Sequence, residues 1–143
     1  MKSTWKTKYS LLIEASDFHN KIRDILISGS FRSVPAYQEV PISDLMLSAE
    51  DIQSAGKMRA DWYLPTLRIV IEVQGRQHYE RVNFGLKPRL ESDLDFIAIQ
   101  NRDLNKKGLL ENSSIKVVYI PYTEEDELNE SYLLRKLEEF NIE

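Results

Sequence analysis

Two short apolar stretches joined by a Pro-Thr turn constrain the fold of this chain most strongly. In the second stretch polar and apolar residues alternate, so that Glu72 and Gln74 share one side of an extended segment. Pro65 and Thr66 interrupt the pattern where a turn is expected. We therefore predict a hairpin of two strands, at about 59–64 and 67–74, whose backbones lie about 5 Å apart.

The remaining elements follow from the spacing of apolar residues. Helical spacing predicts helices at about 10–27 and 88–112, and an acidic C-terminal helix at about 124–141 that Thr123 and Asp126 can cap. Runs of β-branched residues predict strands at about 37–42 and 115–122. The order α-β-β-β-α-β-α indicates an α/β (α+β) fold, a small mixed sheet flanked by helices.

Length and composition favour one globular domain over residues 1–143. The chain is 42% hydrophobic and 29% charged, which is typical of a chain that buries a core and exposes a charged surface. The absence of cysteine excludes disulfide scaffolds and thiolate zinc sites, and is compatible with a reducing cytoplasm. No apolar run is long enough to predict a signal peptide or a membrane span.

The charge distribution bears on a nucleic-acid partner. The net charge of -4 argues against one, but the acidic residues concentrate after position 121 and basic residues predominate in 57–89. From charge alone, chance clustering on a solvated surface is the favoured explanation. If DNA is the partner, the candidate contacts are Arg59, Arg76, Arg81, Lys87 and Arg89.

Asp61 and Glu72 are the candidates for a metal site, because they occupy the two strands of the hairpin. Whether they share a face depends on the register, which the sequence does not reveal. If they do, the two carboxylates converge beside Gln74 and repel each other unless a cation lies between them. Hard oxygen donors, with the backbone carbonyl of Val73 as a further one, select Mg²⁺ or Mn²⁺. The alternative is a pair of solvated acids on an exposed hairpin.

Other residues can complete such a site. Glu14 is expected on the apolar side of the first helix, between Leu11 and Phe18, where a carboxylate needs a partner unless it reaches solvent. His78 follows the hairpin and can protonate a leaving oxygen or orient a water, or else simply bind backbone. His19 is expected to be structural or exposed.

A resemblance emerges from four segments: RADWYLP, IVIEVQGRQHY, NRDLNKKG and IKVVYIPY. Together they resemble the PD-(D/E)xK nuclease superfamily, and more narrowly the branch of the very-short-patch repair endonuclease and the phage EDxHD homing endonucleases. The match covers about residues 10–122 and is most specific from Asp61 to Tyr79. It implies a restriction-endonuclease-like core and a Mg²⁺-dependent DNA endonuclease.

The resemblance also implies roles for single residues. Asp61 would be the main metal ligand, Glu14 the acid of the first helix and His78 the histidine of the signature. Asp103 would be the final acid, with Asp95 as an alternative. Glu72 and Gln74 match the superfamily's E-x-K pair with Gln in place of Lys. Because Gln carries no positive charge, Lys106, Arg76 or His78 would have to compensate.

Three functions are therefore compared. The first is an endonuclease that cleaves double-stranded DNA in the cytoplasm of a bacterial or phage-infected cell. Its variants are a free-standing phage homing enzyme and a repair or junction-resolving enzyme. A homodimer on DNA would supply two sites for a double-strand cut. The second is a nuclease-like fold that binds DNA without cleaving it, which Gln74 favours. The third is a structural or partner-binding protein whose acidic tail docks elsewhere.

Overall fold

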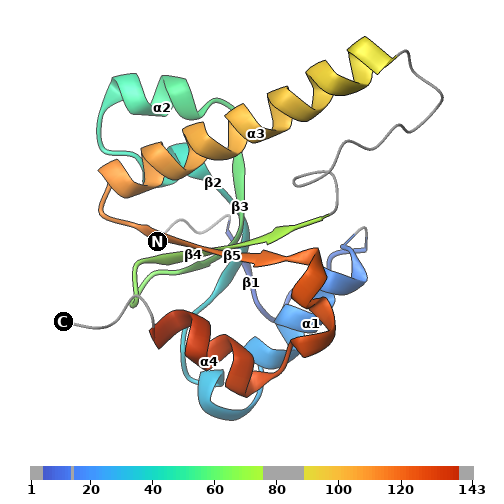
Figure 1. Ribbon diagram of the computed structural model, residues 1–143. Helices are drawn as coiled ribbons and strands as arrows, with labels where there is room; N and C mark the ends of the chain where they lie inside the picture. Colours follow the sequence, from blue (N-terminus) through green and yellow to red (C-terminus); the bar gives the residue numbers. More distant parts are fainter. Residues whose placement is uncertain (1–4, 14, 76–88, 139–143) are drawn as a thin grey trace.

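The predicted hairpin lies in the middle of a mixed sheet (Figure 1). The computed structural model describes residues 5–13, 15–75 and 89–138, and only the backbone of 89–92. Within these residues the sheet has the strand order β1-β2-β3-β4-β5. The strands are β1 (Lys6–Thr7), β2 (Tyr37–Pro41), β3 (Arg59–Leu64), β4 (Ile69–Gln74) and β5 (Lys116–Pro121).

Neighbouring strands from β1 to β4 are antiparallel, whereas β5 pairs with β4 in parallel. Helix α3 (Arg89–Asn112) lies between β4 and β5 in the sequence, as a parallel connection requires. The turn between β3 and β4 is longer than predicted, since β4 begins at Ile69 and Arg68 adopts a φ of 53°. The predicted α/β class, a mixed sheet flanked by helices, is confirmed. The predicted order α-β-β-β-α-β-α lacks β1 and a short helix at Ala49–Ala55.

Helices cover both faces of the sheet (Figure 1). Helices α1 (Asp17–Leu26) and α4 (Glu130–Glu138) pack on one face against a core that includes Trp62 and Ile71. Helices α2 (Ala49–Ala55) and α3 lie over the other face, where the core includes Val70. Opposite faces of β4 therefore serve two different cores, as its predicted alternation requires. Short 3₁₀ segments within the described ranges are η1 (Gly29–Phe31), η2 (Ile42–Leu45) and η4 (Tyr122–Glu127).

Two helices begin later in the sequence than predicted. Helix α1 begins at Asp17, where the Ser16 side chain accepts a hydrogen bond from the backbone N–H of His19, and Leu11 is 72% exposed. The predicted start at residue 10 is therefore wrong. Residues 122–127 form a 3₁₀ segment instead of the start of the last helix. Helix α4 follows it, with the Asn129 side chain accepting a hydrogen bond from the N–H of Tyr132.

Helix α3 also departs from the simple apolar pattern. The apolar residues Leu94, Ile97 and Leu104 on this helix are 56%, 50% and 68% exposed, so they do not join the core. The buried Leu110 and the partly buried Leu109 supply its apolar contacts instead. None of the helices that the structure describes is both long and apolar enough to cross a membrane.

A buried lysine joins the N-terminal segment to the loop after α1. The Lys8 side chain is 3% exposed. Its Nζ donates to the carbonyl oxygens of Leu26, Phe31, Arg32 and Val34 at 2.7–3.1 Å. Burial lowers the pKa of this ammonium. Carbonyl dipoles compensate its charge in place of a carboxylate.

Replacing Lys8 should destabilise the fold. In Lys8→Met the four carbonyls, two of them buried and two partly buried, lose their common donor, so the free energy of unfolding should fall by about 3 kcal/mol. Urea denaturation followed by circular dichroism measures this change. Lys6→Met, at an exposed position two residues away, is the control and should stay within about 0.5 kcal/mol of the wild type. A loss below about 1 kcal/mol for Lys8→Met would contradict this account of the carbonyl cage.

Candidate metal and phosphodiester site

The register of the hairpin decides where its two acids lie. Trp62 pairs with Ile71, and extending the same register by one residue puts Asp61 opposite Glu72. Residues directly opposite each other in an antiparallel pair project from the same face. Both acids lie on the α3 side of the sheet, since Glu72 contacts Lys106 of α3 and Asp61 lines a hollow with the same lysine.

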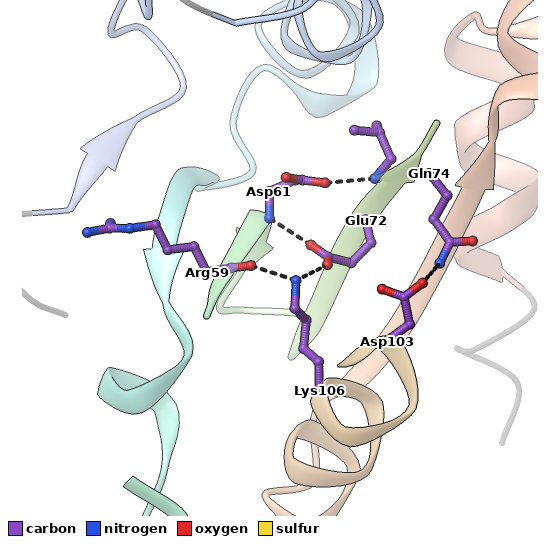
Figure 2. A network of polar contacts seen from close by, with 7 residues as sticks. Arg59, Asp61, Glu72, Gln74, Asp103 and Lys106 are labelled. Atoms are coloured by element: carbon purple, nitrogen blue, oxygen red, sulfur yellow. Dashed lines mark hydrogen bonds and ion pairs between the residues drawn. The ribbon is translucent and has the colours of Figure 1, made fainter. Parts of the chain in front are cut away.

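At this point the backbone N–H groups of β3 and β4 donate to the carboxylates of Glu72 and Asp61, where regular strand pairing would use backbone carbonyls (Figure 2). The backbone N–H of Asp61 donates to Glu72 Oε2 at 2.8 Å, and the N–H of Val73 donates to Asp61 Oδ2 at 2.9 Å. Each strand thus gives an N–H to the acid of its neighbour. This exchange holds both carboxylates between β3 and β4.

Lys106 brings a positive charge to Glu72. Its Nζ lies 2.5 Å from Glu72 Oε1 and 2.9 Å from the carbonyl oxygen of Arg59. The two charged side chains are only 14% and 8% exposed, so solvent screens their attraction little. The pair joins α3 to both strands of the hairpin, as Figure 2 shows.

Gln74 lies two residues after Glu72 on β4, so its side chain projects from the same face, and it also contacts α3. Its Nε2 donates to Asp103 Oδ2 at 3.3 Å, and its side chain is buried. Asp103 and Lys106 are three residues apart on α3, so they reach the same face of the sheet. The structure therefore brings together five of the predicted site residues: Asp61, Glu72, Gln74, Asp103 and Lys106.

Burial and a neighbouring like charge act on Asp61. Burial raises its pKa to about 8, and the negative charge of Glu72 adds to the increase, while the hydrogen bond from Val73 and the charge of Lys106 oppose it. An acid in this state binds either a proton or a cation at neutral pH. Shifts of this kind occur at functional sites and also in structural ion-pair networks.

The donor atoms suit a small divalent cation. Val73 donates its N–H toward Asp61, and in an extended strand the carbonyl of the same residue points to the same neighbour. Two carboxylates and this carbonyl are hard oxygen donors, and Mg²⁺ commonly takes one or two carboxylates and completes its shell with water and substrate. Among the described residues, no group of three or more His, Cys, Asp or Glu side chains is arranged as a metal site, so the two carboxylates would need water or substrate to complete the shell of an ion.

A hollow of about 420 Å³ opens beside Asp61. Asp103 and Lys106 line it from α3, and Arg59 lines it from β3. The sequence analysis missed Glu39, which also lines the hollow and contributes to the raised pKa of Asp61. Extending the β2–β3 register puts Glu39 opposite Asp61. Its φ of 53°, unusual for a non-glycine residue, is a tertiary feature that no sequence pattern indicated.

Several predicted site residues lie outside the described residues: Glu14, Arg76, His78, Arg81 and Lys87. Arg89 begins α3, but its side chain is likewise outside the description. Asp95, the alternative to Asp103, is exposed on α3. Of the two alternatives predicted for His19, structural or exposed, the structure shows the first: its Nε2 lies 2.9 Å from Gln38 Oε1 and its ring stacks on the buried Trp62.

The raised pKa of Asp61 predicts a pH-dependent gain from Asp61→Asn in metal-free buffer. When the pKa of an acid is higher in the folded state than in the unfolded state, the free energy of unfolding falls as the pH rises between the two pKa values. For Asp61 these are the ordinary value of 3.8 and the raised value of about 8. At pH 8 the Asn variant should therefore be more stable than the wild type by about 2 kcal/mol, and the difference should shrink toward pH 5. Thermal unfolding in EDTA across this range measures it. Asp24→Asn, at an exposed position, should show no such trend, and a gain that is constant with pH would refute the assignment.

Comparison with known proteins adds little to this geometry. No family model matches the chain. Over 80 residues it is 35% identical to uncharacterized protein 094L of Frog virus 3 (isolate Goorha). This stretch covers 56% of the chain and 48% of the viral protein, so the chain spans about half the length of that relative. No solved structure matches.

Proposed function

We propose that the protein is a Mg²⁺-dependent endonuclease that hydrolyses DNA phosphodiester bonds at Asp61 and Glu72. The single observation that carries the proposal is the placement of these two acids opposite each other on adjacent strands, in a site that burial keeps largely from water. Buried like charges are costly unless a cation or a proton binds them. A divalent ion is the cation that two carboxylates and a strand carbonyl suit best.

The chemistry divides between the ion and the chain. When bound, the ion polarises the phosphate and lowers the pKa of a bound water. Asp61 and Glu72 would hold the ion, because the hydrogen bonds from the opposite strands keep their oxygens in position. Lys106 supplies the positive charge that Gln74 lacks, because its ammonium reaches the Glu72 carboxylate from α3. Gln74 can orient a water through its amide, and Asp103 positions that amide.

The arrangement around the site supports the restriction-endonuclease-like core that the resemblance implies. An antiparallel hairpin carries the acids, a helix crosses over, and the next strand returns in parallel beside the second hairpin strand. Within this fold a phage homing enzyme, a repair enzyme and a junction-resolving enzyme are variants of one proposal. The roles of Glu14 and His78, a homodimer on DNA and a location in a bacterial or phage-infected cell stay predictions.

A second candidate is a DNA-binding module without cleavage. The observation that favours it is the combination of Gln74 in place of lysine with an ion pair in which Lys106 already neutralises Glu72. In that case Lys106 would serve as a permanent internal cation and no metal would enter. The two candidates differ in whether added metal changes the state of Asp61 and produces cleavage.

Plasmid nicking tests the enzymatic candidate. Supercoiled plasmid should be cut in Mg²⁺ or Mn²⁺ and not in EDTA, and Asp61→Asn should lower the rate at least 100-fold because a ligand of the ion loses its charge. Asp24→Asn serves as the matched control and should cut at the wild-type rate. DNA binding without cleavage by wild type and both variants would favour the second candidate instead.

Replacing Lys106 should strengthen metal binding but slow DNA cleavage. In Lys106→Met the ammonium no longer competes for Glu72, so Mn²⁺ should bind more tightly, by about 10-fold. Cleavage at saturating metal should nevertheless slow by 10-fold or more, because a positive charge near the phosphate is lost. Isothermal titration and single-turnover kinetics measure the two effects. The neighbouring Lys107→Met removes an ammonium that lies over the Tyr119 ring and should change neither; unchanged cleavage by Lys106→Met would exclude the proposed role.

A further inference from the structure

We propose that Lys57, Arg59 and Arg102 form a phosphate clamp that holds the backbone of duplex DNA beside the bond to be cut. This inference rests on the proposed function and names the residues that position its substrate. The three side chains line the same hollow as Asp61. Only Arg59 was singled out by the sequence.

The clamp is assembled from segments far apart in the sequence. Lys57 lies between α2 and β3, Arg59 begins β3, and Arg102 lies on α3. The hollow between them measures about 420 Å³. Since liquid water takes about 30 Å³ per molecule, this is room for roughly a dozen waters, or for a phosphate with its sugar. The space beside the acids is therefore large enough for a segment of a nucleic-acid strand.

Two of the three cations are available to a ligand. In the part of the chain that the structure describes, neither Lys57 nor Arg102 makes an ion pair, and both are exposed. Lysines elsewhere do have acidic partners: Lys21 pairs with Glu125 and Lys136 with Glu124. Unpaired cations beside an opening attract anions, and phosphates neutralised by Lys and Arg are the main source of affinity for DNA.

Arg59 is held in place for the same task. Its Nη1 donates to the carbonyl oxygen of Glu39 at 2.9 Å, which leaves the other guanidinium donors for a ligand. Its own carbonyl accepts the hydrogen bond from Lys106, so the residue links the hollow to the Glu72 ion pair. A guanidinium fixed in this way can bind a phosphate in a defined position.

The acids in the hollow set a condition on the ligand. Glu39, Asp61 and Asp103 line it together with the cations. A phosphate entering beside three carboxylates is repelled unless a divalent cation offsets their charge. The clamp should therefore act on DNA in the presence of metal, with the ion and the three basic side chains holding the same strand.

Equilibrium binding of a fluorescent 30-base-pair duplex tests the clamp. Anisotropy would be measured in Ca²⁺ in place of Mg²⁺, over a series of salt concentrations, for wild type and Lys57→Gln/Arg102→Gln. The matched control is Arg32→Gln/Arg135→Gln, which removes two exposed positive charges after η1 and on α4. The clamp variant should bind at least 10-fold more weakly, and its log–log salt slope should fall in magnitude by about 2, which corresponds to two lost phosphate contacts. The control should match the wild type in both.

The design separates failure of the clamp from failure of the nuclease proposal. If the wild type cuts DNA in an Asp61-dependent manner but the clamp variant equals the control in affinity and salt slope, the clamp is wrong and the nuclease stands. If no protein cuts DNA but the clamp variant loses affinity relative to the control, the phosphate contacts stand and the enzymatic proposal falls. Mn²⁺ titration of the clamp variant should give the wild-type affinity, and a loss there would show that the substitutions act on the metal site and would overturn the clamp.

Discussion

The exchange of hydrogen bonds between Asp61 and Glu72 is the interaction on which the candidate site depends. At this point β3 and β4 would ordinarily continue their backbone pairing, but each strand instead directs an N–H to a carboxylate of its neighbour. Buried carboxylates require such donors, since an unpaired charge in a low-dielectric region is very costly. The ion pair from Lys106 then fixes α3 over the hairpin, so one cluster of charges determines how three elements meet.

Opposing electrostatic effects act on Asp61 within this cluster. Burial and the charge of Glu72 both oppose the ionised form of Asp61, while the hydrogen bond from Val73 and the charge of Lys106 favour it. Elsewhere in the fold, other buried polar groups have hydrogen-bond partners. Gln38 links His19 to the carbonyls of Thr7 and Ser10, and Lys8 gathers four carbonyls around its ammonium. Such networks keep neighbouring elements in one arrangement, which a site of opposed charges needs.

Sequence patterns succeeded where a single local rule decides the outcome. The alternation along 69–74 predicted that Glu72 and Gln74 share one side of β4, and burial of Ile69 and Ile71 in the core on the other face agrees with it. The same reasoning failed for the first helix, because residues at helical spacing need not be buried: Leu11 is exposed and α1 begins only at Asp17. Periodicity describes where apolar side chains would point if the segment were helical. It does not say whether another element covers them.

The sequence by itself determined the hairpin, the side of β4 on which Glu72 and Gln74 lie, and the presence of acids on both strands. Tertiary structure alone decided the pairing of Asp61 with Glu72, the approach of Lys106 and Asp103 from α3, and the place of Glu39. The physical reason is that a strand's period of two is local, whereas register depends on the turn between the strands and on how a helix packs across them. A four-residue turn ending in the positive φ of Arg68 set that register, and with it the meeting of the two carboxylates.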